Sequence, residues 1–216
     1  MCDAIEKLLN AIAAGDDARA EEAALAVGRR GDAAMAPLRD LLADPDSDRR
    51  WWAARTLAAV GTPAARELLV ETLADPDHDV CAAAAQGLGD LGAAEAVAGL
   101  IRCMAASSSS APAPTTNLPT HQPTNLPVYQ STNIVRRIAS DSLARIGTPA
   151  VPALIAALQE GDAPTRSGAA RALSIIQPEA AIPALCAALD DPSAIVTHYA
   201  EEALERMGVG LMLFRP

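Results

Sequence analysis

The chain has 216 residues and a formal net charge of −10 at pH 7, and it is 50% hydrophobic although only 2% of its residues are aromatic. A core without aromatic side chains has to be built from Ala, Leu, Val and Ile, and the abundance of alanine favours helix. The balance of 27 acidic against 17 basic residues excludes nucleic acid as a partner, since binding phosphates requires clustered Lys and Arg.

A motif of fixed spacing recurs three times along the chain. In each copy an Asp-Pro pair stands 17 residues ahead of a glycine, and a leucine precedes that glycine by four residues. The copies are Asp44-Pro45 with Leu57 and Gly61, Asp75-Pro76 with Leu88 and Gly92, and Asp191-Pro192 with Leu204 and Gly208. The first two copies lie 31 residues apart, and a period of this length indicates a repeat array whose units bury a core by stacking.

Taken in chain order, the sequence predicts an unpaired capping helix over residues 3–13 and then a series of helix pairs. The predicted pairs, each a first and a second helix, are residues 17–29 with 33–43, 48–60 with 64–74, 79–91 with 95–105, 134–146 with 149–159, and 163–176 with 179–189. A last first helix is predicted over residues 193–207. We therefore expect about twelve helices in an all-α fold, an α-solenoid of five to six helix pairs.

The unit at residues 79–105 shows most clearly why helices are expected. Val80, Ala84, Leu88 and Leu91 recur at i, i+4, i+8 and i+11, which places them on one stripe of a helix. Gly92 follows that stripe, and glycine stops a helix because it adopts the left-handed conformation without strain. The stripe and its stop predict a first helix that ends at Gly92.

Residues 107–133 interrupt the repeats with an uncharged segment, SSSSAPAPTTNLPTHQPTNLPVYQSTN. Proline at this density is incompatible with helix, so we expect an extended or disordered loop. Such an insertion is tolerated because it costs little free energy. Since a repeat array grows by addition into one continuous body, we predict one domain over residues 1–216. Its first repeats occupy residues 1–106 and its last repeats residues 134–216.

Helix pairs that open with Asp-Pro, continue with Val-Arg as at Val135-Arg136, and end in Ala-Leu-x-x-Ile/Leu-Gly resemble the HEAT-like repeats named after phycobilisome lyases. The resemblance covers residues 15–208 apart from the insert. It implies that the aspartate of one turn bridges to an arginine of a neighbouring unit. The residues in these positions are Arg50, Asp75, Arg166 and Asp191.

The resemblance also allows known activities of such repeats to be compared with this chain. Deoxyhypusine hydroxylase resembles these repeats but has His-Glu pairs ten and nine residues before the closing glycine, where they hold two irons. The corresponding pairs here are Trp51-Trp52, Ala82-Ala83, Arg137-Ile138, Ser167-Gly168 and His198-Tyr199. Only His198 is a possible ligand, so we expect no metal and no other cofactor. HEAT-like alkylpurine DNA glycosylases need a basic concave face, which the acidic composition opposes.

We therefore expect a non-catalytic scaffold or adaptor that binds a protein partner. Tryptophan and tyrosine are frequent binding hot spots, which makes Trp51, Trp52 and Tyr199 candidates for partner binding. A second set of charged residues would line the concave side if the solenoid has the usual curvature: Arg66, Glu67, Glu71, Glu95 and Arg102. The alternatives are that the tryptophans pack in the core and that these charges are ordinary solvated surface. An alternative function is that of a phycobilin-lyase-like accessory protein acting on a chromophore-bearing partner.

The cysteines and the apolar segments of the chain bear on its compartment and its assembly. Cys2, Cys81, Cys103 and Cys186 form no CxxC pair, which indicates neither a zinc knuckle nor a disulfide framework. No stretch reaches 18 apolar residues, and Asp3 and Glu6 stand where a signal peptide needs positive charge. We expect a cytoplasmic protein that does not enter the membrane. The apolar end, residues 211–214, is expected to fold back as a cap or to join another copy of the chain.

Overall fold

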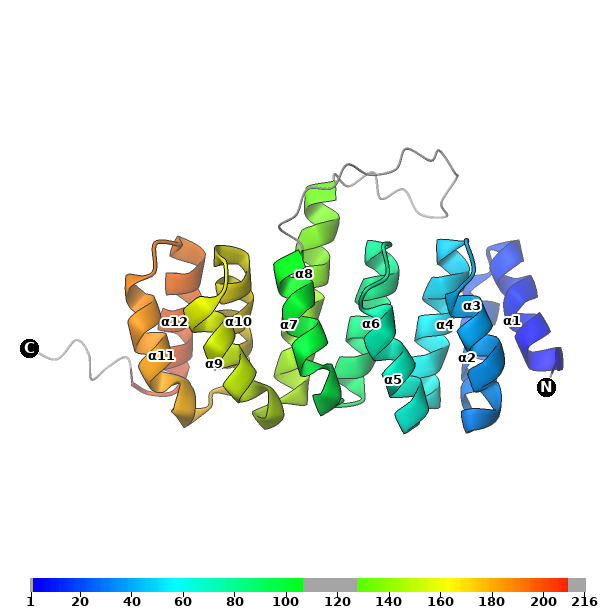
Figure 1. Ribbon diagram of the computed structural model, residues 1–216, viewed down its shortest axis with the longest axis horizontal. Helices are drawn as coiled ribbons and strands as arrows, with labels where there is room; N and C mark the ends of the chain where they lie inside the picture. Colours follow the sequence, from blue (N-terminus) through cyan, green and yellow to red (C-terminus); the bar gives the residue numbers. More distant parts are fainter. Residues whose placement is uncertain (1, 107–127, 210–216) are drawn as a thin grey trace, which may run out of the picture. The chain divides into compact units, whose positions relative to one another are not determined.

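The computed structural model describes residues 2–106 and 128–209, and these residues form twelve α-helices and no strand (Figure 1). The helices before the insert are α1 (Cys2–Ala14), α2 (Asp17–Gly28), α3 (Met35–Leu42), α4 (Ser47–Val60), α5 (Pro63–Thr72), α6 (His78–Asp90) and α7 (Val97–Ala106). Those after it are α8 (Val128–Ile146), α9 (Val151–Glu160), α10 (Ala163–Ile176), α11 (Ile182–Ala187) and α12 (Ala194–Arg206). The prediction of an all-α solenoid of helix pairs is confirmed.

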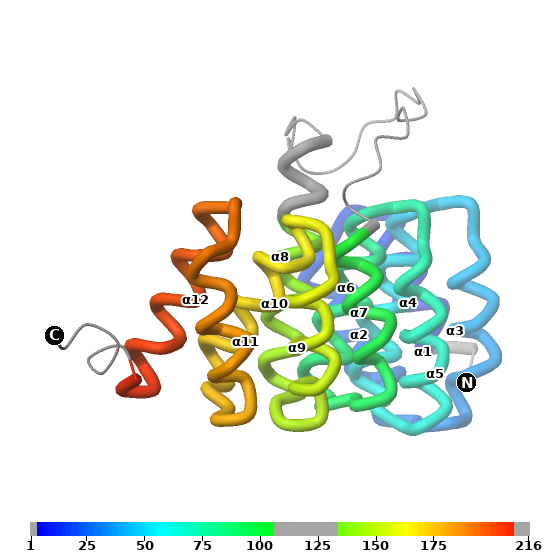
Figure 2. Tube along the Cα trace, turned by 60° about the vertical axis from the view of Figure 1, so that its left-hand side comes forward, coloured from blue at the N-terminus to red at the C-terminus, as the bar shows by residue number. Residues whose placement is uncertain are grey.

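The helices belong to two compact units. The described residues of the first unit are 2–91 and 128–135, and those of the second are 92–106 and 136–209. Within the first unit, α2, α4 and α6 contact one another in succession, while α3 and α5 form a second row beside them (Figures 1 and 2). Within the second unit, α10 packs against α12, and α9 contacts both α7 and α11. The expectation that all repeats form a single domain stays a prediction.

The first helices α4, α6 and α10 begin and end within one residue of the predicted bounds. The carboxylates of Asp46, Asp77 and Asp162 accept hydrogen bonds from backbone N–H groups in the first turns of α4, α6 and α10, which satisfies donors that have no partner within the helix. After α6, Gly92 adopts a φ of +61°, the left-handed conformation expected of a stop. Gln177, the residue directly after α10, is also left-handed, with a φ of +54°, although it has a side chain.

Small residues bring the first helices of the first unit close together. A Cβ atom added at Gly87 of α6 would lie 2.7 Å from the Cβ of Ala58 of α4. One added at Gly28 of α2 would lie 2.8 Å from the Cβ of Ala59. Both distances are shorter than carbon atoms tolerate, so glycine is required where α4 meets its two neighbours.

Leucine provides most of the large side chains of the core. In the first unit Leu57, Leu69 and Leu88 are completely buried, and in the second unit Leu143 and Leu173 are buried in the same way. Leu57 and Leu88 are the leucines of the sequence motif, which stand four residues before their glycines. The motif therefore marks core positions as well as helix ends.

The structure differs from the predicted boundaries in two respects. Four second helices begin with a turn of 3₁₀ helix, at residues 31–34, 94–96, 148–150 and 179–181, so their α-helical parts are shorter than predicted. Helix α8 begins at Val128 instead of residue 134, directly after the last proline of the insert, Pro127.

Residues 107–127 of the insert and the apolar end at 211–214 lie outside the described residues. Across the residues that the structure describes, no helix combines the length and the apolar character needed to span a membrane.

Candidate functional site

Trp52 on α4 is a core residue. Its side chain is 7% exposed and packs in a buried cluster with Leu8 and Ala11 of α1 and with three alanines of α2, at positions 20, 23 and 24. Small side chains on α1 and α2 leave the space that the indole fills. For Trp52 the structure thus agrees with the alternative of a core role that the sequence left open.

Trp51 is half-buried and reaches the surface. Its ring packs against the same cluster and meets the ring of Trp52 edge to face, with centroids 4.9 Å apart and an interplanar angle of 87°. The guanidinium carbon of Arg55, one turn further along α4, lies 5.4 Å from the centroid of the Trp51 ring. Because a cation at this distance is attracted by the ring, the arginine and the tryptophan form one surface feature.

Arg55 is also tied to the neighbouring helix. Its Nη2 atom donates to both carboxylate oxygens of Glu21 on α2, at 3.0 Å and 2.9 Å. The side chains of Arg55 and Glu21 are 35% and 44% exposed, so the pair lies at the surface. Trp51, Arg55 and Glu21 are called here the Trp51 surface. It presents an aromatic ring, a cation and an anion together.

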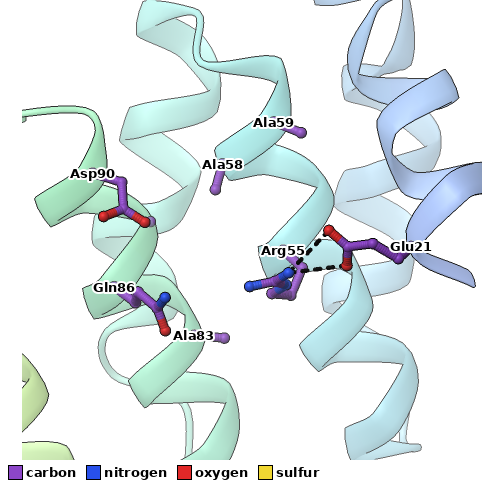
Figure 3. A pocket seen from close by; sticks show the side chains of 8 residues that line it. Glu21, Arg55, Ala58, Ala59, Ala83, Gln86 and Asp90 are labelled. Carbon is purple, nitrogen blue, oxygen red and sulfur yellow. Dashed lines mark hydrogen bonds and ion pairs between the residues drawn. The ribbon is translucent and has the colours of Figure 1, made fainter. Parts of the chain in front are cut away.

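A shallow cavity of about 210 Å³ lies beside this surface and shares Arg55 and Glu21 with it (Figure 3). We call it the α4–α6 groove; its lining residues are Glu21, Arg55, Ala58, Ala59, Ala83, Gln86, Gly87 and Asp90. Small residues form part of the lining, and in Figure 3 Gln86 and Asp90 extend from α6 on the side opposite Glu21. Pockets for cofactors and drug-sized ligands usually enclose about 300–1,000 Å³, so this groove suits a single side chain better than a cofactor.

The 31-residue register accounts for the groove. Ala83 of α6 stands 31 residues after Trp52 of α4 and therefore occupies the same place in its repeat. The tryptophan fills the space between its own helix and the preceding ones, whereas the methyl group of Ala83 leaves the corresponding space open. Sequence reasoning missed the groove, although the alignment of Trp52 with Ala83 contains the signal.

The other predicted binding residues do not join this site. Arg66, Glu67 and Glu71 lie on α5 in the first unit. In the second unit, Glu95 precedes α7, while Arg102 lies on α7 and the half-buried Tyr199 lies on α12. The ring of Tyr199 contacts that of His198, with centroids 5.5 Å apart. A binding role for these residues stays a prediction.

The bridges between repeats that the resemblance implied are present in both units. Arg50 binds Asp75 in the first unit, and Arg166 binds Asp191 in the second. The hydrogen bonds from Arg166 and from the backbone N–H of Ser193 lower the pKa of Asp191 below its ordinary value. The pKa of Asp44 is also lowered, by the backbone N–H of Asp46 and by the Arg49 guanidinium. These residues join turns to helices, so their role is structural.

The family model for HEAT repeats matches residues 5–89, 50–111 and 129–205. No curated protein matches the sequence. In the described parts of the chain, no group of three or more His, Cys, Asp or Glu side chains could hold a metal ion.

Three solved structures that resemble the chain do so at low identity. An engineered protein is 24% identical over 97% of this chain and 98% of its own, with a TM-score of 0.46. The complex of CpcE and CpcF of phycocyanin lyase from Nostoc sp. PCC7120 is 23% identical over 88% of this chain and 72% of its own, with a TM-score of 0.45. Human deoxyhypusine hydroxylase in complex with glycerol is 19% identical over 88% and 90%, with a TM-score of 0.36. At these scores the likenesses carry no functional argument.

Proposed function

The chain belongs to the HEAT-repeat family, and from that premise we propose that it is a protein-interaction scaffold whose partner binds the Trp51 surface. Repeat arrays present long rows of helices to a partner, and their exposed faces are the parts free to bind. The proposed site therefore lies on the row of first helices of the first unit, α2, α4 and α6.

One observation supports the choice of this surface. Trp51 is half-buried against a buried cluster, and Arg55 is held over its ring by the ion pair with Glu21. Tryptophan and arginine are the residues most enriched in binding hot spots, and residues fixed before binding lose little entropy when the partner docks. A pre-ordered Trp–Arg pair of this kind is therefore well suited to anchor a protein partner.

The proposal is tested by affinity capture from the lysate of the native source, with Trp51→Ala beside the wild-type protein. We expect the wild-type protein to enrich a partner that Trp51→Ala loses. Arg55→Gln changes the same surface without touching the core cluster and is expected to weaken the capture as well. The melting temperature of each variant is measured alongside, so that loss of binding is separated from loss of folding.

A matched control is available in the second unit. Ile195 on α12 is 60% exposed, so Ile195→Ala removes an exposed apolar side chain that is not one of the residues of the Trp51 surface. This control is expected to capture the partner as the wild-type protein does. Equal capture by wild-type, Trp51→Ala and Arg55→Gln proteins would contradict the proposal.

The narrower proposal that the partner bears a chromophore rests on the sequence resemblance alone, and a visible absorbance spectrum of the captured complex tests it.

A further inference from the structure

We propose that the α4–α6 groove receives a tryptophan side chain of the protein partner, an inference that rests on the scaffold function proposed above. The groove shares Arg55 and Glu21 with the Trp51 surface, so a partner that binds the one lies directly beside the other. Its volume of about 210 Å³ suits one large side chain rather than a segment of backbone. Charge, size and hydrogen bonding together select tryptophan.

The charged residues of the lining favour a neutral occupant, because each of them already has a partner. Arg55 donates two hydrogen bonds to Glu21, and Asp90 is engaged in an interaction of its own. A charged side chain that entered the groove would give up its hydration and would have to compete with these contacts. A neutral side chain avoids both costs, and it gains contact with the three alanine methyl groups of the lining.

The preceding repeat shows which side chain fills such a space. Trp52 of α4 occupies the position that Ala83 occupies in α6, and its indole packs against three alanines of α2. The α4–α6 groove likewise has alanine on both walls, at Ala58 and Ala59 of α4 and at Ala83 of α6. An indole from a partner would therefore pack against α4 as Trp52 packs against α2, in the space that the small side chain of Ala83 leaves open.

Two polar side chains at the groove favour an indole over an aliphatic side chain. The carboxamide oxygen of Gln86, an exposed residue of α6, can accept a hydrogen bond from the indole N–H. Arg55 extends from α4, and its guanidinium carbon already lies 5.4 Å from the centroid of one aromatic ring, that of Trp51 (Figure 3). The same cation attracts a second ring placed in the groove. A leucine side chain would fill the space without either interaction.

The test uses N-acetyl-tryptophanamide as a neutral probe and the full-length protein with ¹³C-labelled alanine methyl groups. The ring current of a bound indole shifts the signals of nearby methyl groups, so we expect saturable shifts at Ala58, Ala59 and Ala83. Ala64, an exposed alanine of α5 outside the groove, is the control and should not shift. The absence of saturable shifts at the three groove alanines, or equal shifts at Ala64, would overturn the proposal.

Competition measures the selectivity of the groove. An excess of N-acetyl-leucinamide, which has no ring, or of N-acetyl-argininamide, which is charged, should leave the shifts caused by the tryptophanamide in place. Displacement of the tryptophanamide by either competitor at equal concentration would overturn the choice of a neutral indole.

Gln86→Leu isolates the proposed hydrogen bond. It removes the acceptor at an exposed position and is expected to weaken binding of the tryptophanamide by roughly threefold, the usual size of one neutral hydrogen bond. The analogue methylated at the indole nitrogen cannot donate this bond, so Gln86→Leu should not weaken its binding. Gln159→Leu, the same change at an exposed position of α9, is the control and should leave both affinities unchanged. Equal weakening of both probes by Gln86→Leu would overturn the assigned contact.

Filling the groove provides an independent check. Ala83→Trp places in α6 the residue that α4 carries at the same point of its repeat, and the tryptophanamide should then no longer move the signals of Ala58 and Ala59. Circular dichroism verifies that this variant is folded, and Gln86→Leu decides the question if it is not. Binding that survives in a folded Ala83→Trp variant would contradict the assigned location.

Two further outcomes separate this proposal from others. Groove signals that move when the free protein is diluted would show that a second copy of the chain covers the groove, which would overturn the assignment to a partner. The titration does not involve the native partner, so it can fail while capture through Trp51 succeeds. That result would overturn the tryptophan assignment and leave the scaffold function standing.

Discussion

Arg50 binds Asp75 in the turn of the next repeat: its Nε and Nη2 atoms donate to the two carboxylate oxygens at 2.9 Å and 3.1 Å. The Nη1 atom of Arg50 also donates to the backbone oxygen of Asp44, in the turn before its own helix, at 3.0 Å. Arg166 repeats this arrangement with Asp191, again 25 residues further along, and with the backbone oxygen of Gly161. Each arginine thus fastens the turn of one repeat to the turn of the next.

The Arg50→Met variant should destabilise the first unit. The side chains of Arg50 and Asp75 are only 13% and 9% exposed, so the substitution leaves a mostly buried carboxylate without its charged partner. Loss of hydrogen bonds to a charged, largely buried group is expected to lower the free energy of unfolding by roughly 2–3 kcal/mol. Urea denaturation followed by circular dichroism measures the change.

Arg19→Met is the matched control for this prediction. Arg19 pairs with Asp16 at 3.3 Å, but its side chain is 80% exposed, and exposed ion pairs contribute about 0–1 kcal/mol. We expect the control to change the free energy of unfolding by about 0.5 kcal/mol or less. Equal effects of the two substitutions would show that the bridge from Arg50 to Asp75 does not stabilise the stack.

The bridge between Arg166 and Asp191 should make stability depend on pH in the acid range. The hydrogen bond from Arg166 holds the pKa of Asp191 in the folded state below its ordinary value of 3.8. A lowered folded-state pKa means that the stabilisation is fully present above the unfolded-state pKa and is lost as the pH falls through the folded-state pKa. The wild-type protein should therefore exceed Asp191→Asn in stability near pH 6, and the difference should shrink below about pH 4.

Denaturation of both proteins at a series of pH values checks this dependence. Only the difference between the two curves matters, because the other carboxylates titrate in both proteins. Parallel curves from pH 6 to pH 2 would contradict the assigned cause of the lowered pKa of Asp191.

Most of the fold could be predicted from the sequence because the repeat motif marks the positions that determine it. The Asp-Pro turns, Leu57 and Gly61, and their counterparts one repeat later, predicted the helix pairs, the buried leucines and the left-handed stops. The end of α10 at Ile176 was predicted as well, but the left-handed conformation of Gln177 was not, because no glycine stands there.

Only part of the candidate site could be predicted, because the rest depends on how neighbouring helices pack. The pair Trp51-Trp52 stood out by composition, but which ring enters the core depends on α1 and α2, whose small side chains leave room for Trp52. The α4–α6 groove depends on a missing side chain at Ala83, and a missing side chain becomes meaningful only when the neighbouring helices are placed around it. Composition alone does not contain that information.

The two tryptophans should differ in their effect on stability. Trp52→Ala removes a core side chain and is expected to lower the free energy of unfolding by about 3–5 kcal/mol. Trp51→Ala removes a half-buried ring and its contact with Arg55, and a loss of about 1 kcal/mol is expected. Urea denaturation of both variants measures the difference, and a larger loss for Trp51→Ala would contradict the assignment of Trp52 to the core.

Where α4 meets α6, only one of the two facing positions, 58 and 87, should accept alanine. Gly87→Ala places a methyl group 2.7 Å from the Cβ of Ala58, which is expected to reduce stability by about 1–3 kcal/mol. The double variant Gly87→Ala/Ala58→Gly moves the methyl group to the other helix and should recover part of the loss. If the two substitutions prove additive in denaturation experiments, the close contact between these helices is not what destabilises Gly87→Ala.

The central claim is that a protein partner binds the row formed by α2, α4 and α6, and hydrogen–deuterium exchange of the captured complex tests it most directly. Exchange is compared between the free protein and the complex, peptide by peptide along the chain. We expect protection on binding to concentrate at the exposed residues of these three helices around Trp51, with little change in α3 and α5. Protection of α5 around Arg66, Glu67 and Glu71, with α4 unchanged, would contradict the claim and place the partner on the second helices.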